Sequence, residues 1–196
     1  MKTISKLISG ITLALACTAA SATVINFDSL IAPGTYGPNS GSGFTDSGFV
    51  FSSNMDVIDV SPTGAWWSSG VGSGHSGKFA ALNNFYGNMV MTQAGGGTFS
   101  VQDLWLNGWQ GALTSVTIEG LLNGAVTDSY SLTFSSPWTN AVLNFSAVDT
   151  LRINTNGTFL VDDIQVNGSN AIPEPATAAL LGLGLAGLGL ARRRSV

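Results

Sequence analysis

The sequence predicts an all-β protein: an antiparallel β-sandwich of the jelly-roll kind, with an N-terminal signal peptide and a single C-terminal transmembrane helix. First, short apolar runs between residues 24 and 166 alternate with a period of two, and none has the spacing of an amphipathic helix. Second, many glycines and serines separate these runs, as the turns of sandwiches require. Third, both ends are long apolar stretches next to basic residues. An immunoglobulin-like sandwich is the alternative arrangement of the same strands.

The predicted strands follow the alternating runs in chain order. They cover residues 24–28, 49–53, 55–60, 79–82, 89–92, 98–101, 103–109, 115–122, 126–134, 141–145, 150–154 and 158–166. Asn123-Gly124 and Asn156-Gly157 are hairpin signals, because both residue types tolerate positive φ. Residues 32–43 and 61–77 are predicted to be long loops.

The N-terminus is predicted to be a secretory leader. Lys2 and Lys6 precede an apolar run from residue 7 to residue 20, and small residues follow up to Ala22, where signal peptidase is expected to cut. The only cysteine, Cys17, lies inside this leader. The mature chain therefore has no thiol, which excludes cysteine catalysis, thiolate metal sites and disulfides.

The C-terminus contains three parts: an extended motif, an apolar helix and a basic cluster. They are Pro173, Glu174 and Pro175; residues 176–191; and Arg192, Arg193 and Arg194. The prolines prevent a helix from running back into the core. The arginines keep the extreme C-terminus in the cytoplasm, so everything before the motif lies outside the membrane. This divides the chain into residues 1–22, 23–170 and 171–196.

This C-terminal segment resembles the PEP-CTERM sorting signal, also described as an ice-binding-protein C-terminal domain, of Gram-negative bacteria that make exopolysaccharide. The resemblance implies recognition and processing near Pro173-Glu174-Pro175 by an exosortase, a membrane protease-transferase. It also implies transient anchoring in the inner membrane and a final position at the cell surface or outside the cell. A C-terminal anchor that is never cut is the alternative.

The charge of the central domain excludes one class of partner. Residues 23–170 contain ten acidic residues but only two basic ones, Lys78 and Arg152. Nucleic-acid binding requires many basic contacts to phosphates. We therefore expect no nucleic-acid partner.

The central domain also lacks the sequence signals of an enzyme. His75, the sole histidine, lies in a Gly/Ser loop without a nearby acidic residue and is expected to be solvated. Asp56 and Asp59 lie three apart on a strand and therefore face opposite ways. Because nucleophile motifs, metal triads and phosphate loops are absent as well, the sequence predicts a non-enzymatic protein with no catalytic residues.

The last strand contains a carboxylate at an apolar position. Alternation places Asp162 on the face of Leu160, Ile164 and Val166, the expected core face, and Asp163 on the solvated face. A buried carboxylate needs a partner, and an exported all-oxygen site favours calcium. The alternatives are that Asp162 pairs with Arg152, caps a strand end or meets water.

A second resemblance concerns the two ends of the domain. Phe27-Asp28 and Val161-Asp162-Asp163-Ile164 resemble the first and last strands of carbohydrate-binding jelly rolls, where carboxylates from both ends hold a structural calcium. The resemblance implies Asp28, Asp162 and Asp163 as the metal ligands.

Tryptophans are the candidate ligand-binding residues, because flat rings present apolar faces to sugars. Trp105 and Trp109 lie on the face of strand 103–109 opposite its leucines, and Trp66 and Trp67 lie in a Gly/Ser loop. The alternative for Trp105 and Trp109 is a secondary core covered by a loop.

These observations lead to one hypothesis and two alternatives. The hypothesis is an exported, exosortase-sorted protein that contacts extracellular polysaccharide without cleaving it. The alternatives are a secreted polysaccharide hydrolase and a purely structural matrix or ice-contacting protein.

Overall fold

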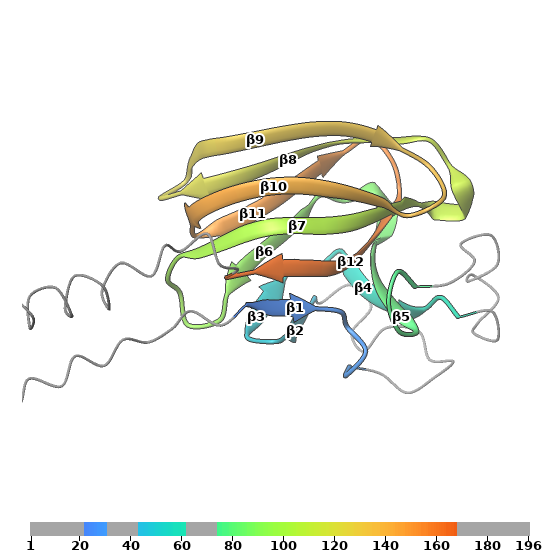
Figure 1. Cartoon of the computed structure of the whole chain (residues 1–196), viewed down its shortest axis with the longest axis horizontal. Coiled ribbons are helices and arrows are strands. Elements are labelled where there is room, and N and C mark those ends of the chain that lie inside the picture. Colours follow the sequence, from blue (N-terminus) through green and yellow to red (C-terminus); the bar gives the residue numbers. More distant parts are fainter. Residues whose placement is uncertain (1–21, 31–42, 62–73, 168–196) are drawn as a thin grey trace, which may run out of the picture. The chain divides into compact units, whose positions relative to one another are not determined.

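A computed structural model describes residues 22–30, 43–61 and 74–167, which form two antiparallel sheets packed face to face (Figure 1). Sheet A has the order β10-β7-β12-β5-β4, with β1 paired to β12. Sheet B has the order β2-β3-β6-β11-β8-β9. This confirms the predicted all-β sandwich.

The strand bounds agree with most of the predicted ranges. Sheet A contains β1 (Thr23–Ile25), β4 (Met55–Asp59), β5 (Phe79–Asn83), β7 (Phe99–Gly108), β10 (Thr139–Val148) and β12 (Phe159–Val166). Sheet B contains β2 (Phe44–Asp46), β3 (Phe49–Phe51), β6 (Met89–Gln93), β8 (Thr114–Leu122), β9 (Ala125–Phe134) and β11 (Thr150–Thr155). The helical elements of the described ranges are the 3-10 turns η2 (Asn84–Tyr86) and η3 (Trp109–Gly111).

Two strand predictions need correction. The predicted strands 98–101 and 103–109 are one strand, β7, whose pairing with β12 and β10 is irregular but unbroken. The three-residue strand β2 was not predicted. It pairs with β3 across a turn at Ser47 and Gly48, both with positive φ.

One of the two hairpin predictions is confirmed. Asn123 and Gly124 connect β8 to β9, with φ values of 53° and 79°. Asn156-Gly157 is not a hairpin turn, because it leads from β11 in sheet B to β12 in sheet A. Neither of these two residues has a positive φ.

Alternation places one set of side chains between the sheets. On β7, Leu104 and Leu106 are fully buried there, as predicted. On β8, Val116 and Ile118 belong to the same core. The intervening residues of both strands therefore lie on the outer faces of the sandwich.

A second apolar cluster covers part of the outer face of sheet A. It consists of Ile58, Val60, Ala80, Leu82 and Leu160, with Trp109 and Trp138 packed against it. Sheet A is thus buried on both sides at this end. Trp138, which is part of the site described below, packs against this cluster.

The two ends of the chain are not described by the structure. The leader up to residue 21 and the tail 168–196, which includes the predicted transmembrane helix, lie outside the described residues. Within residues 22–30, 43–61 and 74–167, we find no helix with the length and hydropathy of a membrane span.

Candidate functional site

Two aspartates from opposite ends of the domain hold the segment 74–79. β1 pairs with β12, so the first and last strands of the domain lie side by side (Figure 1). Asp28, just after β1, accepts the Lys78 and Phe79 N–H groups at 2.8 and 3.1 Å. On β12, Asp162 Oδ2 accepts the His75 and Ser76 N–H groups at 3.0 and 3.1 Å.

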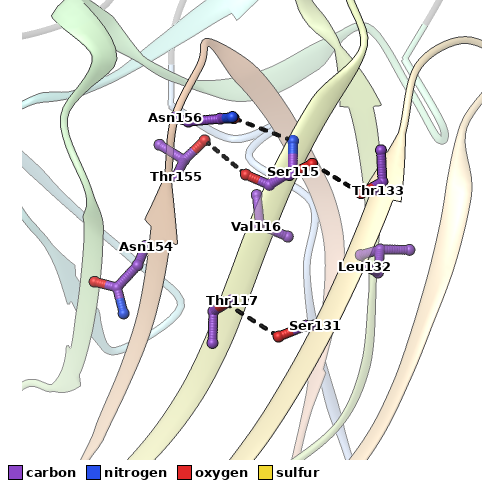
Figure 2. Close-up of a pocket in the computed structure, with 9 residues that line it drawn as sticks. All are labelled: Ser115, Val116, Thr117, Ser131, Leu132, Thr133, Asn154, Thr155 and Asn156. Carbon is purple, nitrogen blue, oxygen red and sulfur yellow. Dashed lines mark hydrogen bonds between the residues drawn. The ribbon is translucent and has the colours of Figure 1, made fainter.

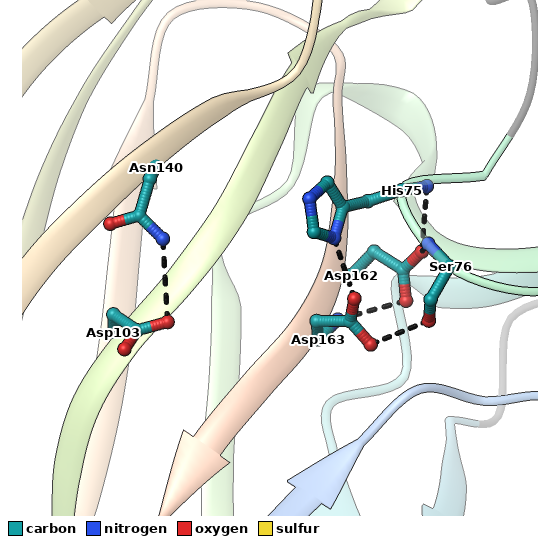
Figure 3. Close-up of polar contacts among 6 residues, drawn as sticks. All are labelled: His75, Ser76, Asp103, Asn140, Asp162 and Asp163. Atoms are coloured by element: carbon teal, nitrogen blue, oxygen red, sulfur yellow. Dashed lines mark hydrogen bonds and ion pairs between the residues drawn. The ribbon is translucent and has the colours of Figure 1, made fainter.

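Asp163 binds the side chains of the same segment. Its Oδ2 lies 2.6 Å from His75 Nδ1, and its Oδ1 accepts the Ser76 hydroxyl at 2.6 Å (Figure 3). The carboxylate therefore fixes the orientation of the imidazole. The expectation that His75 and Asp163 are simply solvated is wrong, since their side chains are only 28% and 15% exposed.

The imidazole lies on the outer face of sheet A. The ring of His75 stacks on Trp105 with centroids 3.7 Å apart and planes 16° apart. Trp138 meets the same ring edge-on at 6.2 Å. Because all three side chains are only partly buried, they form a partly exposed aromatic group, here called the ring cluster.

Polar side chains border the ring cluster. Asn140 of β10 lies opposite Trp105 and donates to Asp103 Oδ1 at 3.3 Å (Figure 3). Asn107 is fully buried, accepts the Ser136 hydroxyl at 2.9 Å and has no partner for its Nδ2 among the described residues. The cluster therefore combines flat apolar rings with amide and carboxylate groups.

Asp162 has unusual electrostatics. Its side chain is fully buried, and this burial raises its pKa from 3.8 to about 8. The N–H of Ser76 opposes the rise in pKa, whereas the neighbouring Asp163 carboxylate adds to it. At neutral pH the carboxyl group therefore keeps its proton unless a cation lies beside it.

Backbone carbonyl oxygens lie close to Asp162 beside Gly74. Ser76 O, Gly77 O and Asp162 Oδ2 lie 2.5, 3.3 and 3.5 Å from the point where a Cβ on Gly74 would be. Oxygen-only donor sets of carbonyls and carboxylates are what calcium prefers. The described residues contain no group of three or more acidic, histidine or cysteine side chains arranged for a metal. An ion here would therefore depend on backbone carbonyls.

The predicted orientation of Asp162 was wrong. Leu160 belongs to the outer cluster, whereas Ile164 and Val166 belong to the core between the sheets. A bulge between Asp162 and Gln165, with Asp163 at φ 44°, changes the phase of the alternation. Asp162 is buried on the outer face, beneath the segment 74–79.

The alternative partner of Asp162 is also excluded. Arg152 lies on β11 in sheet B and contacts Glu119, with Nη2 and Nε 2.7 and 2.8 Å from Oε2. Glu119 lies opposite Arg152 in the register of β8 and β11. The arginine is therefore engaged in the other sheet.

Of the four predicted tryptophans, the structure describes two, Trp105 and Trp109. Trp105 is in the ring cluster, and Trp109 packs against the outer apolar cluster, as Trp138 does. Trp66 and Trp67 lie outside the described residues. His75 and Trp138 were missed as site residues, because their contacts join strands and loops far apart in the sequence.

The site does not contain a serine hydrolase triad. His75 and Ser76 both bind Asp163, each through its own carboxylate oxygen. In a triad the histidine bridges the serine and the acid. Here the acid bridges the other two, so the imidazole does not activate this hydroxyl.

Comparison with known proteins identifies the C-terminal segment. Residues 171–194 match the PEP-CTERM protein-sorting motif, which confirms the resemblance seen in the sequence. The motif implies an exported protein that an exosortase sorts. A comparison with curated proteins found no match to the sequence.

Solved structures resemble the sandwich. A DUF4465 family protein from Bacteroides caccae has 10% identity and a TM-score of 0.56, covering 74% of this chain and 98% of its own. The K1 adhesin domain of Lys-gingipain from Porphyromonas gingivalis has 9% identity and a TM-score of 0.44, covering 74% and 97%. TmCBM61, solved with β-1,4-galactotriose, has 13% identity and a TM-score of 0.36, covering 69% and 98%. The first of these supports the two-sheet fold.

Proposed function

We propose that this protein is an exported, exosortase-sorted jelly-roll sandwich that contacts extracellular polysaccharide through the ring cluster and does not cleave it. The observation that carries the proposal is the stack of His75 on Trp105, flanked by Trp138, on an outer face of the sandwich. Aromatic faces bordered by amide and carboxylate groups suit sugar rings, whose C–H faces pack on the π-system while their hydroxyls form hydrogen bonds. Trp66, Trp67 and Trp109 are proposed as further contacts.

The route to the cell surface follows from the two ends of the chain. Signal peptidase cuts after Ala22, and the C-terminal helix then anchors the protein transiently in the inner membrane. The exosortase recognises Pro173-Glu174-Pro175 and releases the domain to the surface or the extracellular matrix. The PEP-CTERM match supports the sorting step.

The absence of cleavage is supported by the local geometry. Asp163 binds both the Ser76 hydroxyl and the His75 imidazole. The imidazole is therefore not placed to take the proton of this hydroxyl and activate it for attack on a substrate. Asp56 and Asp59 are buried on one edge strand and alternate between its two faces. Neither arrangement provides the pair of facing carboxylates that glycoside hydrolysis requires.

The test is retention of the full chain in gels that contain the extracellular polysaccharide of the producing bacterium. Trp138→Leu keeps an apolar side chain against the outer cluster but removes the flat ring, so it should weaken retention. Tyr86→Ala removes a 70% exposed aromatic ring elsewhere and should not. Equal retention of wild type and Trp138→Leu would contradict the ring cluster as the contact. Shortened polymer would favour the hydrolase, and no retention at all would favour a purely structural protein.

A further inference from the structure

An open groove lies on the outer face of sheet B, on the side of the sandwich opposite the ring cluster. It has a volume of about 550 Å³ and crosses β8, β9 and β11. Its lining residues are Ser115, Val116, Thr117, Ser131, Leu132, Thr133, Asn154, Thr155 and Asn156 (Figure 2). Its size is that of small-molecule sites, which span roughly 300 to 1,000 Å³.

Paired hydroxyls form the floor of the groove. Ser115 Oγ lies 2.8 Å from Thr133 Oγ1, and Thr117 Oγ1 lies 3.1 Å from Ser131 Oγ (Figure 2). A pair of hydroxyls has two hydrogens but uses only one for its mutual bond, and either oxygen can be the donor. Each pair therefore presents a donor and free lone pairs to a ligand.

Amide side chains held in place form the wall along β11. Asn154 Nδ2 donates to Glu119 at 2.6 Å, and its Oδ1 accepts from Asn88 Nδ2 at 3.1 Å. Asn156 Oδ1 accepts the Ser115 N–H at 3.3 Å. These bonds fix the amides before any ligand arrives, which reduces the entropy lost on binding.

The chemistry of the lining selects among ligand classes. None of the nine residues is charged, and Glu119 beside the groove is neutralised by Arg152. The lining therefore offers no positive charge to a phosphate. Val116 belongs to the core and Leu132 packs against it, so the remaining side chains of the lining carry hydroxyl or amide groups. Neutral groups that both donate and accept match an uncharged, hydroxyl-rich polymer.

We propose that this groove binds a neutral glycan chain, and that the protein bridges two chains by holding one on each face of the sandwich. The bridging part rests on the proposed function of the ring cluster. The two surfaces belong to different sheets and face away from each other, so one ligand does not obstruct the other. Binding at two sites adds avidity without new contacts.

The experiment uses the full chain, purified in mild detergent and shown to be monomeric by light scattering. Beads coated with xylan, β-1,4-galactan or hydroxyethyl cellulose report binding by depletion and bridging by agglutination. Ser131→Arg places a long charged side chain across the groove from an exposed position. Ser115→Ala with Thr133→Ala removes one hydroxyl pair together, which leaves no orphaned partner. Ser146→Arg, at an exposed position of β10, is the matched control.

The expected result is that wild type and Ser146→Arg agglutinate beads of at least one polymer. Ser131→Arg and the double alanine variant should still bind through the ring cluster but lose agglutination. Combining Ser131→Arg with Trp138→Leu should abolish binding. If Ser131→Arg agglutinated beads as well as wild type, the proposal that the groove binds a glycan would be wrong. If wild type agglutinated none of the three kinds of bead, the proposal that the protein bridges two chains would be wrong. If the single variant Ser131→Arg lost binding and Trp138→Leu bound like wild type, the groove would be retained as a glycan site and the ring cluster would be rejected as one.

Discussion

Asp162 and Asp163 bind the same two residues, His75 and Ser76, but through different atoms. Asp162 accepts their backbone N–H groups, and Asp163 accepts the Ser76 hydroxyl and contacts the His75 imidazole. Asp162 therefore fixes the backbone of the segment 74–79, and Asp163 orients the side chains of His75 and Ser76. The bulge at Asp163 makes this possible, because it lets two consecutive residues face the same segment.

Gly77 allows the other carboxylate, Asp28, to approach the same segment. A Cβ at Gly77 would lie 1.6 Å from Asp28 Oδ2, and its φ is 55°. Gly48 has a φ of 82° but nothing within 4 Å of its Cβ position. We expect Gly48→Ala to lower the free energy of unfolding by about 1 kcal/mol, the usual cost of positive φ. Gly77→Ala should cost clearly more, because Asp28 must also move.

Urea unfolding of both variants measures this difference. The Gly48→Ala protein serves as the control, since it carries the backbone cost without the clash. Equal losses of stability in the two variants would show that Asp28 is not held against Gly77 and that its bonds to Lys78 and Phe79 are dispensable.

Where a strand is regular, the alternation of apolar and polar residues was sufficient to predict which side chains face the core. It placed Leu104 and Leu106 in the core and Trp105 on the outer face, as the structure shows. It failed at Asp162, because a residue in the left-handed region changes the phase of the strand and leaves no mark in the hydrophobic pattern. An Asp-Asp pair is a weak signal for such a bulge, since Asp tolerates positive φ better than most residues.

Contacts distant in the sequence explain the remaining misses. His75 Nδ1 binds a carboxylate 88 residues away, so no local pattern near the histidine indicates a partner. The predicted hairpin at Asn156-Gly157 failed because a turn signal does not say whether the next strand stays in the same sheet. The ring cluster and the groove both depend on strand order, which alternation does not determine.

The sorting motif leads to a prediction outside the sandwich. Glu174→Ala changes the motif but leaves the apolar stretch and the three arginines intact. We expect the precursor to remain in the inner membrane, because the exosortase no longer recognises it. Mass spectrometry of the C-terminus after cell fractionation measures this. The same mature C-terminus in wild type and variant would contradict a role for Glu174.

The arginines test the topology separately. Replacing Arg192, Arg193 and Arg194 by Ser removes the positive charges that are predicted to hold the extreme C-terminus in the cytoplasm. A protease-protection assay in spheroplasts should then find a fraction of the C-termini exposed on the outer side. Complete protection, as in wild type, would mean that the arginines do not determine the orientation.

We narrow the sequence prediction of a calcium ion held by Asp28, Asp162 and Asp163 to an ion beside Asp162 with backbone carbonyls of the segment 74–79, because the three carboxylates are not grouped around a metal in the described residues. An ion that binds only the folded state stabilises it, by about 2.7 kcal/mol at a free concentration 100 times the Kd. A chelator should therefore lower the Tm of the full chain, and added calcium should restore it. Magnesium should restore less, because it keeps its waters and demands octahedral geometry.

Two variants test whether the calcium ion lies beside Asp162. Asp162→Asn keeps the size of the side chain but removes its charge, so it should abolish the response to calcium. Asp128→Asn, on β9 in the other sheet, should leave the response unchanged. A wild-type Tm that does not move on chelation would reject the site.

The raised pKa of Asp162 gives the last prediction, made in the presence of chelator. Burial holds this pKa at about 8 in the folded state, whereas an ordinary exposed aspartate has a pKa of 3.8. Between these two pH values the folded chain keeps a proton that the unfolded chain releases. The contribution to stability is therefore complete below about pH 4 and is lost as pH rises to about 8, by at most about 1.4 kcal/mol per pH unit.

Urea unfolding from pH 4 to pH 9 measures this slope as the difference between wild type and Asp162→Asn, whose amide does not titrate. The difference cancels the contributions of the other carboxylates, and Asp128→Asn should keep the wild-type slope. Calcium should reduce the slope, because a cation beside Asp162 favours its charged form and thus opposes the effect of burial. Parallel wild-type and Asp162→Asn curves without calcium would show that the Asp162 carboxyl is ionised in the folded protein. The three N–H groups that it accepts, from His75, Ser76 and Asp163, would then outweigh its desolvation.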